Sequence, residues 1–524
     1  MKYPDFFSTF RHIILLGFVV IATSCASLPE NVQRTESHAL ENTDKTKLGR
    51  GITPYLKRHP GKSGFHVLQT GLDAFTARIV LIERAEKSLD VQYYIWHDDL
   101  TGRVLHNRLL HAADRGVRVR LLLDDLDTAG KGQMLNILDS HPNIEIRLFN
   151  PFANRTMDFV TDLSRVNHRM HNKSLTGDNQ ATILGGRNIG DEYFDAAEDV
   201  AFSDLDVLGF GPVVQKVSSA FDLYWNSQWV YPLSAFPLDE PVKQSDIAAY
   251  RQQSDQFFEE ARQSKYAAAL RDNELAQIIR RGDKLDVSWG KWFLVYDDPS
   301  KVEADEVTAE THLGPKLREA LDKTQKEAII VSPYFVPGKE ITAYLNGLVK
   351  KGIRVRILTN SLAANDVSIV HAGYMRYRED LVNGGVELYE YKRTFSKEEM
   401  KQKKKDKKKS KWTGSSHASL HAKSFTFDER YLFIGSFNLD ARSIALNTEM
   451  GVFFESPEYA RAMSKAFDEK GLIKAYRVEL KDDQLEWITL ENGKKVSYDV
   501  EPDTSWWKRF STGFLSVFVV ESQL

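Results

Sequence analysis

The sequence is almost devoid of cysteine, because Cys25 is the single one among 524 residues. One cysteine excludes an intramolecular disulfide. The chain also lacks a membrane-spanning run near its start, since the apolar residues 13–21 fall short of the roughly 20 that a spanning helix needs. A net charge of -3 indicates no particular partner. The apolar and charged fractions of 42% and 27% are typical of globular proteins, and this length favours two domains.

The start of the chain has the pattern of a secretory signal. Lys2 and Arg11 flank the beginning, the short apolar run follows, and small residues lead to Cys25. This is the position at which a bacterial lipoprotein carries its lipidated cysteine, and Ala26 resembles the residue after it in outer-membrane lipoproteins. We therefore expect residues 1–25 to be a lipoprotein-type signal peptide. The protein would be lipid-anchored in the bacterial cell envelope, on the periplasmic side of the inner or outer membrane. A plain cleaved signal and an uncleaved amphipathic anchor are the alternatives.

Two copies of one short phrase, 250 residues apart, stand out in the rest of the chain. Residues 171–178 read HNKSLTGD, with GGRN at 185–188, and residues 421–428 read HAKSFTFD, with GSFN at 435–438. In a chain with 14 histidines, a chance His-x-Lys-x4-Asp is expected only about 0.05 times. Two matched copies with matched continuations therefore indicate a duplication.

The duplication extends through the strands and helices before each phrase. Apolar strand-like runs alternate with helical spacing, which predicts an α/β fold of two pseudo-symmetric α-β-α domains with the active site at their interface. The matching segments are 90–95 with 329–334, 116–124 with 352–360, and 144–149 with 386–391. The predicted boundaries are a polar, disordered tether at 26–63, a first domain at 64–234, a helical connector at 235–291, a second domain at 292–475, and a C-terminal appendage at 476–524.

Two segments raise the question of a membrane. Residues 397–411 hold nine lysines against three acidic residues. This run is either a solvated loop, a binding site for anionic lipid, where each Lys adds about 1 kcal/mol, or a nucleic-acid patch. The aromatic tail of the appendage, residues 506–520, predicts either core packing or contact with a membrane surface.

A set of His, Lys and Asn present twice suits the chemistry of one phosphodiester. An imidazole can attack phosphorus, and a second one can protonate the leaving alkoxide. We therefore expect His171 and His421 to face each other across the phosphate. Lysine and amide side chains stabilise phosphate oxygens, a role that Lys173, Lys423, Asn188 and Asn438 would fill.

Each imidazole also needs a carboxylate on its other nitrogen to fix its tautomer. Asp204 and Glu449 stand at comparable places after the two phrases, and Asp206 competes with Asp204. We expect Asp204 or Asp206 to orient His171, and Glu449 to orient the histidine of the second phrase, His421. Asp178 and Asp428, which end the phrases, are expected to form structural ion pairs and not to touch substrate.

The paired phrases resemble the two HKD motifs of the phospholipase D superfamily, and residues 64–515 are similar to bacterial cardiolipin synthases. The stretches 90–96, 167–174, 185–190, 359–366 and 446–451 carry this resemblance. It implies two phospholipase D-like domains without a metal or other cofactor. It also implies His171 as the nucleophile and His421 as the acid and base. The implied reaction transfers a phosphatidyl group from phosphatidylethanolamine to phosphatidylglycerol, giving cardiolipin and ethanolamine.

Three other functions remain as alternatives. A hydrolytic phospholipase D would use water in place of the lipid alcohol and release phosphatidic acid. A nucleic-acid phosphodiesterase is disfavoured by the anchor-like start and the aromatic tail. A noncatalytic membrane-organising lipoprotein is disfavoured because both catalytic sets are intact. The expected partners are therefore phospholipid substrates and an anionic membrane surface, with no nucleic acid.

Overall fold

The computed structural model describes residues 28–155, 158, 162–197, 200–236, 238, 240–304, 306–365, 367–393 and 417–518. The expected signal peptide with Cys25 and the lysine-rich segment 397–411 lie outside these residues. Within the described ranges, no helix combines the length and the apolar composition that crossing a membrane requires.

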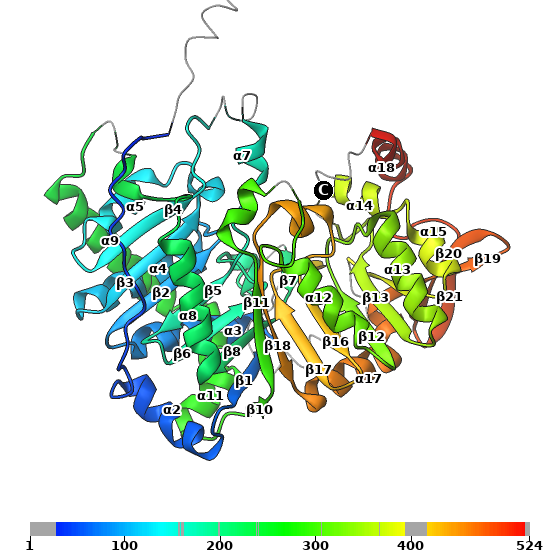
Figure 1. Ribbon diagram of the computed structural model, residues 1–524, viewed down its shortest axis with the longest axis horizontal. Helices are drawn as coiled ribbons and strands as arrows, with labels where there is room; N and C mark the ends of the chain where they lie inside the picture. Colours follow the sequence, from blue (N-terminus) through cyan, green and yellow to red (C-terminus); the bar gives the residue numbers. More distant parts are fainter. Residues whose placement is uncertain are drawn as a thin grey trace, which may run out of the picture.

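Two large mixed sheets lie beside each other, one in each half of the chain (Figure 1). In strand order, the first consists of β10 (Ser288–Gly290), β1 (Ser63–Leu68), β8 (Asp206–Phe210), β6 (Ala181–Gly185), β5 (Ser174–Gly177), β2 (Ser88–Tyr93), β3 (Arg118–Asp124), β4 (Ile144–Phe149) and β9 (Val230–Pro232). The second consists of β11 (Trp292–Tyr296), β18 (Met450–Glu455), β17 (Tyr431–Gly435), β16 (Ser424–Phe427), β12 (Glu327–Val331), β13 (Arg354–Asn360), β14 (Glu387–Tyr391), β19 (Ala475–Lys481), β20 (Gln484–Glu491) and β21 (Lys494–Tyr498). A small parallel sheet joins β7 (Val200–Ser203) to β15 (His417–Leu420).

The two large sheets repeat one plan. The parallel strands β2, β3 and β4 are followed along the chain by β5, β6 and β8, which add antiparallel to the other side of β2. The strands β12, β13, β14, β16, β17 and β18 do the same in the second half. The register repeats as well, with Asp90 opposite Thr176 and Ile329 opposite Thr426. The predicted duplicated α/β fold is therefore confirmed.

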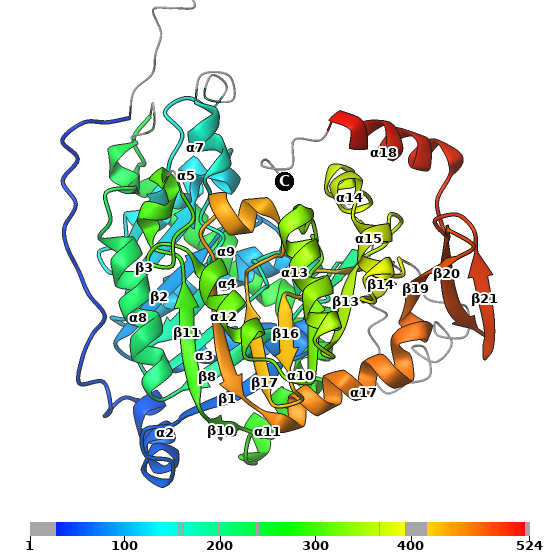
Figure 2. The same ribbon diagram turned by 45° about the vertical axis from the view of Figure 1, so that its right-hand side comes forward.

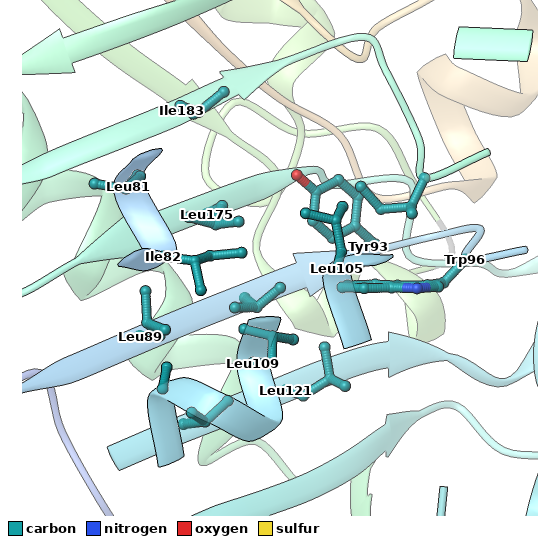
Figure 3. Close-up of a cluster of buried hydrophobic side chains, with 14 of the residues drawn as sticks. Leu81, Ile82, Leu89, Tyr93, Trp96, Leu105, Leu109, Leu121, Leu175 and Ile183 are labelled. Carbon is teal, nitrogen blue, oxygen red and sulfur yellow. The ribbon is translucent and has the colours of Figure 1, made fainter. Parts of the chain in front are cut away.

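Helices cover both faces of each sheet, because successive strand residues point to opposite faces. On β3, Leu121 packs under α3 and α4, whereas Leu122 packs against α8. Figure 3 shows the first of these cores, with side chains of α3 and α4 against those of β2, β5 and β6. On β12, Ile330 packs under α12 and α13, and Ile329 under α17. The helices are α2 (Lys47–Arg58), α3 (Gly71–Arg84), α4 (Leu100–Asp114), α5 (Gly132–Asp139), α7 (Leu163–Asn167), α8 (Pro212–Trp225), α9 (Gln244–Arg262), α10 (Lys265–Asp272), α11 (Glu274–Arg281), α12 (Leu313–Asp322), α13 (Gly338–Lys350), α14 (Ser368–Tyr374), α15 (Arg378–Asn383), α17 (Pro457–Lys474) and α18 (Trp506–Phe518).

One apolar core spans the two halves. Phe65 and Val207 of the first sheet pack in the same buried cluster as Ile434, Val452 and Phe454 of the second. The rings of Phe65 and Phe454 stack with their centroids 4.6 Å apart. Burial of one such side chain contributes about 1.5–3 kcal/mol. These contacts make the interface between the halves part of the folded core.

The segment predicted to be a disordered tether is packed against the first domain. The guanidinium of Arg34 donates to the Val230 carbonyl over 2.7 Å, and Arg120 donates to the Ser37 carbonyl over 2.8 Å. The chain then forms α2, whose first turn is capped by Thr46 and whose Ile52 is buried. The tether prediction was wrong because the polar groups of this segment pair with backbone and side chains of the domain, a pattern that composition does not reveal.

The connector and the appendage both extend a domain. Helices α9, α10 and α11 pack on α3 and α4, so the connector forms a further layer on the first domain. The appendage begins with β19, β20 and β21, which continue the second sheet beyond β14. Helix α18 follows and lies beside α14 (Figure 2).

Candidate active site

Both histidines lie on short extended segments that lead into a central strand. His171 and Lys173 immediately precede β5, and His421 and Lys423 precede β16. A spacing of two residues on extended backbone puts the imidazole and the ammonium group of each pair on one side. The exposed fractions of His171 and His421 are only 8% and 6%, so the site lies inside the protein.

Backbone contacts between the halves bring the two phrases together. Strand β15 pairs in parallel with β7, and the His421 amide continues this pairing by donating to the Ser203 carbonyl over 2.8 Å. The equivalent contact joins Met170 to Thr448, where the His171 amide donates to the Thr448 carbonyl over 2.8 Å. Each histidine therefore lies beside the residue that precedes the acid of the other half.

As a consequence, the carboxylate of each half contacts the histidine of the other half. Glu449 places its oxygens 2.9 and 3.1 Å from Nδ1 of His171, and Asp204 places an oxygen 2.5 Å from Nδ1 of His421. The expectation that Asp204 or Asp206 orients His171 was wrong. The two interdomain pairings decide the partner, and these form between segments more than 200 residues apart.

Within the ranges that the structure describes, Asp206 does not contact either histidine and forms ion pairs inside the first domain instead. Its carboxylate forms buried ion pairs with Arg78 at 2.9 Å and with Arg187 at 3.4 Å. As the first residue of β8 it points into the first domain, two residues beyond the acid that reaches the site. Its pairing with two guanidinium groups leaves Asp204 as the acid of this half.

The two acids occupy equivalent positions but have different neighbours. Glu449 accepts hydrogen bonds from the hydroxyls of Ser436 and Ser443, the latter over 2.8 Å. Gly186 occupies the position equivalent to Ser436, and there an added Cβ would lie 2.3 Å from an Asp204 oxygen. The first half therefore needs glycine to admit its carboxylate, whereas the second half uses serine to hold the longer one.

Each lysine of the repeated phrases contacts its own histidine, and the asparagines lie in the same buried region. Lys173 donates to the His171 carbonyl over 2.6 Å, and Lys423 donates to the His421 carbonyl over 2.5 Å. Asn188 donates to the Tyr193 hydroxyl over 3.0 Å. Among the described residues, the buried amide oxygen of Asn438 has no hydrogen-bond partner. The site therefore gathers two ammonium groups and two amides around two imidazoles, a set that suits an anionic phosphate.

The environment favours a neutral imidazole at His171. Burial lowers the pKa of His171 well below its usual value, and the charges of Lys173, Lys423 and His421 lower it further. Burial also lowers the pKa of Lys173 to about 7, against the opposing effect of the Glu449 carboxylate. A neutral His171 keeps a free electron pair on its outer nitrogen when Nδ1 donates to Glu449.

The two acids respond differently to burial. Burial raises the pKa of Glu449 to about 7, although Lys173 and the two serine hydroxyls oppose it. Burial would also raise the pKa of Asp204, but His421, Lys423 and Arg187 outweigh that effect and hold this pKa below its usual value. Burial and Lys423 lower the pKa of His421, whereas its ion pair with Asp204 opposes them. The net effect lowers the pKa of His421, but less than that of His171, because the Asp204 carboxylate favours a proton on His421.

Several residues of the site were not anticipated from the sequence. The ring of Tyr94 lies edge-on to His171, and Tyr193 lies edge-on to His421, each with centroids 5.1 Å apart. The buried carboxylate of Asp297 accepts a hydrogen bond from the Glu449 amide over 2.7 Å and forms an ion pair with Lys301 at 3.0 Å. Tyr94 follows β2 inside a segment that carries the family resemblance, whereas Asp297 and Lys301 have no repeated counterpart that could have revealed them.

Asp178 and Asp428 have structural roles, but in the described part of the chain they bind backbone amides and form no ion pair. Asp178 accepts hydrogen bonds from the backbone amides that enter β2, including Lys87 over 2.7 Å. Asp428 accepts from the amides that enter β12, including Lys326 over 2.7 Å. The motif aspartates therefore tie the end of the β5 and β16 strands to the start of their neighbours.

Comparisons with known proteins agree with this geometry. The family model described as "Cardiolipin synthase, PLD-like domain" matches the chain twice, over residues 79–225 and 317–470. Cardiolipin synthase C of Escherichia coli is 43% identical over 481 residues, covering 91% of this chain and 99% of that protein. An uncharacterised protein of Helicobacter pylori is 32% identical over 88% of this chain and 90% of its own length.

A solved structure supports the fold. The phosphatidylserine synthase of Haemophilus influenzae superposes with a TM-score of 0.55 at 14% identity, covering 90% of this chain and all of that one. At this identity the likeness concerns the arrangement of the elements alone. The duplicated domain, the paired motifs and the matching family model together show that the chain belongs to the phospholipase D superfamily, within its cardiolipin synthase family.

Proposed function

We propose that the protein is a phosphatidyltransferase that makes cardiolipin and ethanolamine from phosphatidylethanolamine and phosphatidylglycerol. The observation that carries this proposal is the pair of crossed histidine–carboxylate contacts, one of Glu449 with His171 and one of Asp204 with His421. They build one two-histidine site out of both halves. The identity of 43% to cardiolipin synthase C over nearly its whole length supports the choice of lipids.

His171 is the nucleophile in this proposal. Its neutral imidazole donates from Nδ1 to Glu449 and attacks the phosphorus of phosphatidylethanolamine with the other nitrogen. Lys173, Lys423, Asn188 and Asn438 hold the phosphate oxygens as charge develops on them. The bond from phosphorus to the ethanolamine oxygen breaks, and a phosphatidyl group remains on His171.

His421 moves the proton in both steps. In the first, its imidazolium, stabilised by Asp204, donates a proton to the departing ethanolamine oxygen. In the second, the neutral His421 takes a proton from the terminal hydroxyl of phosphatidylglycerol, and this oxygen attacks the phosphorus. The bond between phosphorus and His171 breaks, which releases cardiolipin and restores both histidines. Water in place of the lipid hydroxyl would release phosphatidic acid.

The burial of the site favours transfer over hydrolysis. Lys173, Lys423, Asp204 and Glu449 are all almost fully buried, and aromatic rings lie against both imidazoles. A site closed in this way limits the access of water to a reactive intermediate.

The test of this function supplies labelled phosphatidylethanolamine and phosphatidylglycerol to the purified full-length chain and separates the products. We expect labelled ethanolamine and cardiolipin. His171→Ala and His421→Ala should each lower turnover about 1,000-fold or more, because each removes one of two cooperating groups. His168→Ala is the matched control, since His168 is partly exposed and bonds to the Ser164 carbonyl.

Two outcomes would contradict the account. Phosphatidic acid as the main product despite excess phosphatidylglycerol would reassign the enzyme to hydrolysis. Substantial residual turnover in either alanine variant, with an unchanged circular dichroism spectrum, would refute the shared two-histidine site.

The pKa of Lys173 predicts a specific pH profile. Free enzyme loses the Lys173 charge as the pH rises through about 7, and Glu449 becomes ionised over the same range. The value of kcat/KM should therefore rise toward pH 7 and fall above it. Lys173→Arg should move the falling limb upward, because a guanidinium stays charged. Lys323→Arg, on an exposed lysine, is the control. An unshifted falling limb in Lys173→Arg would show that another group controls it.

We propose membrane attachment on sequence grounds alone. Cys25 would carry the lipid anchor in the bacterial envelope, and the lysine-rich segment 397–411 would bind anionic lipid. Mass spectrometry of the mature protein should find a lipidated Cys25 at its N-terminus. Deletion of residues 401–411 should weaken binding to phosphatidylglycerol vesicles, most at low salt. An unmodified Cys25, or equal binding by the deletion variant, would refute the corresponding half of the proposal.

A further inference from the structure

The C-terminal helix α18 exposes an unusual number of large apolar side chains. Trp506, Trp507, Phe510 and Phe514 are 63%, 66%, 51% and 59% exposed, and Leu515 of the same helix is exposed too. These are five of the twelve large apolar side chains that are exposed in the described part of the chain. The three aromatic residues of the first turns lie against one another, with Trp506 stacked on Phe510 at 5.2 Å.

Two more exposed apolar side chains lie on α14, the helix beside α18. Helix α14 packs beside α18, and Val367 and Ile369 at the start of α14 are exposed as well. We call these residues of α14 and α18 together the aromatic face. Large apolar side chains that gather on the surface of a folded protein mark a site of contact with a partner or a membrane.

The aromatic face is held in place by the second domain. Just before α18, the buried carboxylate of Glu501 pairs with Arg378 at 2.7 Å and with His371 of α14 at 2.9 Å. At the other end of the helix, the Arg376 side chain donates to the Ser516 carbonyl. The helix is therefore fixed with its aromatic side chains directed away from the core.

The charge of α18 suits an anionic lipid surface. Lys508 and Arg509 lie between the aromatic residues, and residues 506–518 contain no aspartate or glutamate. Tryptophan and phenylalanine with interleaved basic residues are typical of helices that lie in the interface of a bilayer. The solvent-facing side of a surface helix normally carries charged or polar residues instead.

Bonded contacts connect the aromatic face to the active site. At the end of β13, Asn360 makes two hydrogen bonds to the backbone of Leu420, the residue before His421, at 2.9 and 3.0 Å. Ser419 donates to the Ala364 carbonyl in the loop that leads to α14 over 2.9 Å. In Figure 2, α18 lies at the upper right of the molecule, above α14 and α15. The aromatic face and His421 thus belong to the same end of the second sheet.

We propose that the aromatic face is a membrane-docking surface that inserts into an anionic bilayer and holds the active-site end of the molecule against the lipid. This proposal rests on the proposed lipid-transferring function, because it explains how a buried site meets substrates that remain in a membrane. The aromatic residues would lie at the level of the headgroups, with Lys508 and Arg509 against lipid phosphates.

Tryptophan quenching tests the docking directly. The full-length chain is reconstituted into vesicles of phosphatidylethanolamine and phosphatidylglycerol that contain a lipid brominated on its acyl chain. We expect quenching of tryptophan fluorescence that is largely lost in a Trp506→Phe, Trp507→Phe double variant. The matched control, Trp289→Phe with Trp292→Phe, changes two partly exposed tryptophans of β10 and β11 and should keep the quenching. Equal quenching in the wild type and the α18 variant would overturn the proposal.

A second measurement separates docking from catalysis. The triple variant Trp506→Ser, Trp507→Ser, Phe510→Ser should turn over vesicle lipid at least about tenfold more slowly than the wild type. Its rate on the same lipids dispersed in detergent should stay within about twofold, because the catalytic groups are untouched. A wild type that makes no cardiolipin, yet shows the quenching pattern, would refute the proposed function and leave the docking surface standing.

Two further outcomes would overturn the docking proposal. One is an unchanged rate of the triple variant on vesicles. The other is a dimer of the wild type that dissociates in the triple variant, seen by sedimentation together with unquenched tryptophans, which would assign the aromatic face to a second copy of the chain.

Discussion

Two backbone contacts between the halves, β7 with β15 and Met170 with Thr448, are the constraint on which the site depends. Each sets a histidine of one half beside a carboxylate of the other. Neither half alone contains an oriented imidazole, so the duplication creates a site that a single domain could not form. Such short pairings have little stability by themselves, and the apolar core that contains Phe65 and Phe454 supplies the rest.

The duplication leaves the two histidines in unequal environments. His171 contacts the Glu449 carboxylate, which accepts hydrogen bonds from serine hydroxyls. Burial raises the pKa of Glu449 to about 7. His421 faces Asp204, whose pKa is held below its usual value by the surrounding cations. An imidazole that stays neutral suits nucleophilic attack, and one beside an ionised carboxylate suits proton transfer. Small differences between equivalent positions, such as Gly186 and Ser436, therefore give the two histidines different roles in a pseudo-symmetric site.

Much of this was predictable from the sequence, because the signals were local or repeated. The doubled phrases predicted the histidines, lysines and asparagines, and the strand and helix periodicities predicted the duplicated α/β plan. The crossing of the carboxylates was not predictable, since Asp204 and His421 meet through a strand pairing that bridges 217 residues. The supporting Asp297 was missed because it belongs to no repeat. The packing of the segment around Arg34 was not predictable either, because Arg34 binds a backbone carbonyl and amino-acid composition does not indicate such contacts.

The crossed pairing is tested most directly by the first half-reaction with a phosphatidyl donor whose leaving group, p-nitrophenol, departs without a proton. Stopped-flow absorbance measures the burst of p-nitrophenolate as the phosphatidyl group is transferred to His171. The account predicts that Asp204→Asn keeps a burst within about threefold of the wild-type rate, because p-nitrophenolate leaves without needing a proton from His421. Glu449→Gln should slow the burst about 100-fold or more, because His171 loses the carboxylate that orients it. A burst lost in Asp204→Asn and kept in Glu449→Gln would contradict the account.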